Sequence, residues 1–193
     1  MAMKELKPIP IANIVRVEIE NYPETTGGGG GTPTKQYRIK TADEITCKPF
    51  VSEGKEDILR SFNTIMAQNK LEDIVLGYEL TLKEVAMSPE VFALIDGGNV
   101  TYKSGTIFQS YEGPAVGQET KRELFKIMIY SEQKDANGGN VSYMKTTFEY
   151  GKGKPAEFSF KNGEWVTPSY SIKTAAKIGE KPIKIEVLDS LPA

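Results

Sequence analysis

Residues 74–98, IVLGYELTLKEVAMSPEVFALIDGG, contain the two patterns that decide the fold. In the first nine residues an apolar side chain occupies every second position: Ile74, Leu76, Tyr78, Leu80 and Leu82. Successive side chains of an extended chain point to opposite faces, so this alternation predicts a half-buried β-strand.

The second pattern, residues 88–98, predicts a short capped helix. Ser88 suits the N-cap, and Pro89 suits the first helical position, where its missing N–H would have no partner. Gly97 permits the left-handed conformation that ends a helix. Val91, Phe92 and Ile95 would then fix this corner on the core between two strands, so the simplest interpretation is a packed connection.

The alternation continues along the chain, in residues 15–20, 124–130, 144–150 and 183–187. Turn signals join these runs: Ala136–Asn140 contains Asn-Gly-Gly, and Asn162-Gly163 follows Phe160. Asn-Gly favours the tight turns of β-hairpins, so an antiparallel meander is expected.

One segment shows a helical period instead. From Glu56 to Lys70, apolar side chains recur at spacings of three and four: Ile58, Leu59, Phe62, Ile65 and Met66. Acidic residues precede this stripe and Lys70 ends it, as a helix dipole favours. We therefore predict a mainly β (α+β) fold: an antiparallel β-sandwich or barrel with one flanking α-helix across a sheet and the short capped helix. The 193 residues fit a single domain.

Composition argues against chemistry at an active site. The chain has no histidine, one cysteine and a formal net charge of −2. Histidine is the commonest general base and metal ligand, and a single cysteine forms no internal disulfide. We expect no catalytic residue, no cofactor site and no metal site, no tight nucleic-acid binding, and a buried apolar role for Cys47. Neither a signal peptide nor a membrane span is predicted.

Two features of the sequence allow a structural explanation and a functional one. Gly27–Gly31 form the tip of a loop between two expected strands, which is either mobile or ordered by contact with another molecule. Several expected strands also have a polar second face, which either meets solvent or lines an aqueous channel made by several copies. Its members are Arg16, Glu18, Glu79, Lys145, Thr147 and Glu149.

Residues 80–98, LTLKEVAMSPEVFALIDGG, resemble the middle of the major tail tube proteins of long-tailed bacteriophages, and residues 181–193, KPIKIEVLDSLPA, are similar to their last strand and tail. The resemblance implies a structural virion protein of the viral tail, assembled in the host bacterial cytoplasm. Copies would form hexameric rings that stack into a hollow tube, through which DNA passes without specific binding. The implied partners are other copies, the tape measure protein and the tail terminator and tip proteins, with no membrane.

The same resemblance implies which segments bridge subunits. They are an N-terminal arm (1–10), a long hairpin loop (22–35) and a C-terminal arm (189–193). The implied contact residues are Thr26, Gly29, Gly30, Thr32 and Leu191.

Other functions stay open. Within the same class, the chain could form the inner tube of a contractile tail or of a tail-like bacteriocin. From another class, it could be a β-sandwich module that binds a carbohydrate or a receptor, with Trp165, Tyr170 and Phe160 as candidate residues, although such residues more often belong to a core. An enzyme is the third and weakest option.

Overall fold

The computed structural model describes residues 3, 5–22, 33–117, 119–120 and 122–192. The described chain is mainly β, with a single α-helix among the described residues. Its elements are β1 (Ile11–Asn21), β2 (Gln36–Ile39), β3 (Ala42–Ser52), β4 (Glu56–Ser61), β5 (Thr64–Lys70), β6 (Ile74–Glu84), α1 (Pro89–Asp96), β7 (Asn99–Tyr102), β8 (Phe108–Glu112), β9 (Phe125–Lys134), β10 (Asn140–Gly153), β11 (Glu157–Ser159), β12 (Thr167–Ala175) and β13 (Ile183–Leu188).

Nine strands form one antiparallel sheet in the order β2-β1-β9-β10-β12-β6-β3. In addition, β11 pairs with β12, and β13 pairs with β10. Two hairpins, β4–β5 and β7–β8, are paired separately from this sheet. The predicted mainly β, antiparallel class is therefore confirmed.

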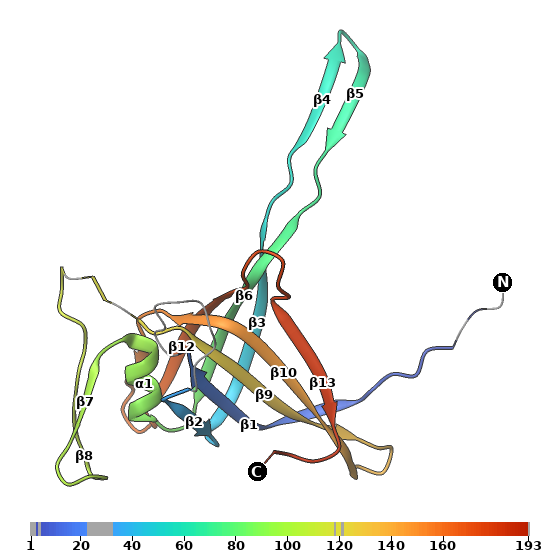
Figure 1. Ribbon diagram of the computed structural model, residues 1–193. Coiled ribbons are helices and arrows are strands. Elements are labelled where there is room, and N and C mark those ends of the chain that lie inside the picture. Colours follow the sequence, from blue (N-terminus) through green and yellow to red (C-terminus); the bar gives the residue numbers. More distant parts are fainter. Residues whose placement is uncertain (1–2, 4, 23–32, 118, 121, 193) are drawn as a thin grey trace.

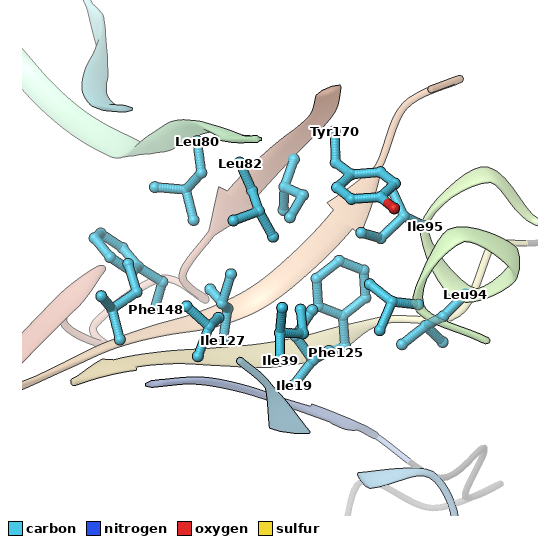
Figure 2. Close-up of a cluster of buried hydrophobic side chains, with 14 of the residues drawn as sticks. Ile19, Ile39, Leu80, Leu82, Leu94, Ile95, Phe125, Ile127, Phe148 and Tyr170 are labelled. Atoms are coloured by element: carbon cyan, nitrogen blue, oxygen red, sulfur yellow. The ribbon is translucent and has the colours of Figure 1, made fainter. Parts of the chain in front are cut away.

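The large sheet bends so that two of its parts face each other across one core (Figure 1). Leu80 and Leu82 of β6 face Ile127 of β9 and Phe148 of β10, and all four are almost completely buried (Figure 2). The chain passes from one part to the other at Thr41, where it leaves β2, which pairs with β1, and enters β3, which pairs with β6. Such bent strands are a usual way of making the corner of a sandwich.

Helix α1 closes one end of this core, as predicted for residues 88–98. Leu94 and Ile95 point towards the buried cluster (Figure 2). Gly97 takes a left-handed φ of 88°, and its N–H donates to the carbonyl of Ala93 at 2.8 Å. Ser88 stands at the N-cap, although its hydroxyl donates to Glu84 at 3.2 Å instead of capping the helix backbone.

The prediction of a long flanking helix at residues 56–70 is wrong. These residues form the antiparallel strands β4 and β5, which turn at Phe62 and Asn63, with Phe62 at a φ of 50°. Their apolar side chains have the spacing of a helical stripe, but the segment lies outside the body of the sandwich, where no sheet of the described chain covers such a stripe. Pairing of the two runs satisfies the backbone instead.

Most local expectations for the sheet are confirmed. Asp135–Gly139 turns the chain between β9 and β10, and β11 is joined to β12 through the turn at Asn162 and Gly163. Cys47 is an exception, because it is exposed on β3 instead of buried. The strand β3 forms the last position of the sheet order, so its side chains lack a neighbouring strand on one side.

Candidate assembly surface

The hairpin β4–β5 projects well away from the body of the molecule (Figure 1). All of its residues are exposed, on both faces of the two-stranded ribbon. Its exposed apolar side chains are Ile58, Leu59, Phe62, Ile65 and Met66. A two-stranded ribbon that buries neither face is marginal in water, so this element is suited to a partner surface.

The base of the hairpin is held by specific contacts. The N–H of Gly54 donates to the Asp73 carboxylate at 2.8 Å, and the N–H of Leu71 donates to the carbonyl of Lys55 at 3.0 Å. A Cβ on residue 54 would lie only 1.7 Å from the carbonyl oxygen of Leu71, so glycine is required for this close approach. The ribbon therefore leaves the sheet in a defined direction.

A second surface is the open edge of β13. This strand pairs through one edge with β10, from Ile183 opposite Phe148 to Leu188 opposite Tyr143. Among the described residues, no strand pairs with its other edge. Ile185 and Val187 are 57% and 58% exposed, so the alternation of this strand correctly predicted its form but not its burial. An uncovered edge with apolar side chains is a template for pairing with another chain.

The polar face expected from the alternation lies on β1, β9 and β10, opposite the main core, and Arg16 and Thr147 within it are buried. Its charges are largely paired: Glu18 lies 3.1 Å from Arg16 and 3.2 Å from Arg38. Tyr130 donates to Glu18 at 2.9 Å, and its burial and then this hydrogen bond raise the pKa of Tyr130 to about 12. Such a face carries neither sign of charge in excess, so it offers little attraction to phosphates.

The other residues of the predicted polar face lie on β10 and β6, and both of its remaining carboxylates have a polar partner. Thr147 and Lys145 of β10 lie on the same face, since Phe148 points into the core, and Thr147 is buried there. Glu149 accepts a hydrogen bond from Tyr22, and Glu79 on β6 forms an ion pair with Lys154 at 3.3 Å.

The predicted bridging loop, residues 22–35, is described only at its two stems. Asn21 is buried, and its side-chain oxygen accepts from the N–H groups of Thr34 and Lys35 at 3.0 and 2.8 Å. The four predicted contact residues of the tip, Thr26, Gly29, Gly30 and Thr32, lie outside the described residues. Their roles stay predictions.

The two predicted arms differ. Residues 5–10 are exposed and lead away from the body (Figure 1). Near the other terminus Leu191 is half-buried, and the carbonyl of Pro192 accepts from Arg16 Nη1 at 3.0 Å. The described part of the C-terminal arm therefore folds back on its own β1, and the contact role of Leu191 stays a prediction.

Two of the three candidate carbohydrate-binding residues are exposed. Trp165 is 90% exposed and Phe160 is 76% exposed, whereas Tyr170 is completely buried. The sequence alone favoured burial for all three. Phe160 lies 6.0 Å from Phe158 between ring centroids, so two aromatic rings are neighbours on the β11–β12 hairpin.

Other kinds of site have little support among the described residues. In that part of the chain no three Cys, Asp or Glu side chains are grouped so as to hold a metal ion. Nor does the described chain contain a helix that is long and apolar enough to cross a membrane.

The fold and these surfaces define an antiparallel β-sandwich with a projecting hairpin. No protein family and no curated protein matches the chain. A chain in the cryo-EM structure of the anti-feeding prophage baseplate, 6-fold symmetrised, is similar over 97% of both chains, with 10% sequence identity and a TM-score of 0.46. A similarity of this degree concerns only the course of the chain and has no bearing on function.

Proposed function

We propose that this protein is a structural subunit that assembles with copies of itself into stacked rings, as the tail tube of a bacteriophage does. The observation that carries the proposal is the hairpin β4–β5, whose apolar side chains are exposed on both faces. A neighbouring copy that covers this ribbon would remove apolar surface from water and stabilise the assembly.

The resemblance of residues 80–98 and 181–193 to major tail tube proteins supports the same proposal. In such an assembly the partly exposed ion pairs on the polar face of β1 and β9, Lys126 with Glu20 and Lys134 with Glu132, would suit the wall of a channel for DNA. A wall without excess positive charge releases few counterions from DNA and therefore does not hold it. The tape measure and the terminator and tip proteins would be further partners, and no catalytic step or cofactor is involved.

The experiment is negative-stain microscopy of the concentrated full chain, together with analytical ultracentrifugation. We expect rings or rods and a mass distribution that shifts with concentration. A protein that sediments as a monomer at every concentration, with no rings or rods, contradicts the proposal.

A second candidate function is carbohydrate binding on the β11–β12 hairpin, which the exposure of Trp165 and Phe160 favours. Exposed aromatic rings offer flat apolar faces to sugar rings, and Glu157 and Glu164 of the same hairpin could accept hydrogen bonds. Trp165 is the sole tryptophan of the sequence, so its fluorescence would report binding directly. Unchanged fluorescence and no retention on a panel of bacterial glycans would remove this candidate.

A further inference from the structure

We infer that strand β4 of one copy adds to the open edge of strand β13 of a second copy, as a parallel strand. This inference rests on the proposed function, since it names the surfaces through which the copies would join. It concerns two elements that are each incomplete within a single chain.

Both elements offer unpaired backbone groups. Strand β4 pairs only with β5, and β13 pairs only with β10, so among the described residues each has one edge without a strand partner. Both strands contain six residues, so their edges match in length. Addition of a strand to an exposed edge satisfies these N–H and C=O groups and is a recurring mode of recognition.

The charges of the two strands determine the direction. In β4 the acidic Glu56 and Asp57 come first and Arg60 comes near the end. Around β13 the order is reversed, with Lys181 and Lys184 first and then Glu186 and Asp189. A parallel alignment brings the acidic start of β4, Glu56 and Asp57, to the basic start of β13, and Arg60 towards its acidic end, whereas an antiparallel alignment brings Glu56 and Asp57 to the acidic end. Cross-strand pairs of like charge are unfavourable.

The apolar side chains agree with the same alignment. If Asp57 lies beside Lys184, then Ile58 lies beside Ile185 on the other face of the pair. Ile58 and Ile185 are both exposed in the isolated chain and would be covered together. Contact between different surfaces of identical chains is heterologous, and it produces rings when the rotation closes and filaments when it does not.

Two charge-reversed variants test the contact. The first carries Glu56→Lys and Asp57→Lys, and the second carries Lys181→Glu and Lys184→Glu. Each variant places like charges across the contact, so we expect the concentration required for assembly to rise by at least about tenfold. A 1:1 mixture restores opposite charges at every contact when the two variants alternate, so it should assemble near the wild-type concentration.

The matched control carries Glu112→Lys and Glu119→Lys, which reverse two exposed acidic residues outside both strands. It should assemble as the wild type does, and circular dichroism should show all variants folded. If the wild type assembles and either reversed variant assembles equally well, or if the mixture fails to assemble, the inference is overturned while the proposed function stands. If the wild type never assembles, both are overturned.

The direction of the strand has its own test. A chain with Cys47→Ser, Ile58→Cys and Ile185→Cys should form disulfide-linked chains of several copies under mild oxidation of the assembled protein. Each single-cysteine variant in the same Cys47→Ser background should give at most dimers. Absence of a ladder from an assembled double-cysteine protein overturns the parallel alignment.

Discussion

The carboxylate of Glu84 joins four parts of the molecule although it is almost completely buried. It accepts hydrogen bonds from Tyr170 of β12 at 2.9 Å, from Ser88 before α1 at 3.2 Å and from Thr41 between β2 and β3 at 3.3 Å. When a buried carboxylate loses such a donor, the free-energy cost of removing it from water is no longer fully offset, and the protein is destabilised. The arrangement therefore fixes the end of the sandwich that α1 closes.

Tyr170→Phe removes the shortest of these hydrogen bonds and should lower the free energy of unfolding by about 1–3 kcal/mol. Urea unfolding followed by circular dichroism measures the change. The control is Tyr102→Phe, because Tyr102 donates to Glu90 on the surface, where water replaces the lost partner. If both variants lose the same free energy of unfolding, the buried hydrogen bonds to Glu84 stabilise the fold no more than a surface hydrogen bond does.

Glu84→Gln should change how stability depends on pH. Burial raises the pKa of Glu84, and the hydroxyl donors oppose this shift only partly. The native state then holds the proton more tightly than the unfolded state, so ionisation of Glu84 lowers the free energy of unfolding as the pH rises from its ordinary pKa through the raised value. Glutamine does not titrate, so the variant lacks this decrease.

The measurement is the difference in unfolding free energy between wild type and Glu84→Gln, from urea unfolding between about pH 4 and pH 8, a range that begins near the ordinary pKa of glutamate. The other titrating groups contribute similarly to both proteins. The wild type should lose stability relative to the variant as the pH rises. A constant difference over the whole range contradicts the argument.

At the level of strands and helices, local sequence patterns predicted most elements, because alternation and capping depend on residues close together in the chain. Alternation identified β6 and β9, and the Ser88, Pro89 and Gly97 signals identified α1. Burial was less predictable, since it depends on what lies opposite. Ile74 and Leu76 belong to the same alternation as the buried Leu80, yet they are exposed where β6 runs out towards the hairpin.

The hairpin β4–β5 shows why the candidate surface could not be predicted. Five apolar side chains at spacings of three and four fit one face of a helix, but they fit equally a ribbon with apolar groups on both faces. The one local signal for the second interpretation was Asn63 between the two runs, which suits a tight turn. The choice depends on what packs against the segment, and among the described residues nothing covers it.

Excision of the hairpin should separate folding from assembly. Residues 56–70, replaced by Asn-Gly, leave the neighbouring positions 55 and 71 close enough to be joined by a tight turn, because Leu71 donates to Lys55. The free energy of unfolding should change by no more than about 1 kcal/mol, since no core side chain is removed. Ultracentrifugation should detect monomers only. An excised protein that still forms rings or rods would show that the hairpin is dispensable.

At the scale of the whole molecule, assembly should protect the projecting ribbon β4–β5 from cleavage by trypsin. Lys55, Arg60 and Lys70 are exposed in the isolated chain, and none of the described residues outside the ribbon covers it, so trypsin should cleave there early in the monomer. A second copy that pairs with β4 would restrain this backbone and slow cleavage after Arg60. Lys181, beside β13, should become protected in the same samples.

Mass spectrometry of timed digests at concentrations below and above the onset of assembly measures both rates. Lys161 is exposed on the β11–β12 hairpin, outside the proposed contact, and its cleavage provides an internal control for trypsin activity. Joint protection of Arg60 and Lys181 is expected if both surfaces lie in one contact, because a neighbour that covered only the hairpin would leave Lys181 open. If assembled protein is cleaved after Arg60 at an unchanged rate, the ribbon remains in solvent after assembly. Burial of its apolar side chains would then not be the reason why the subunits assemble.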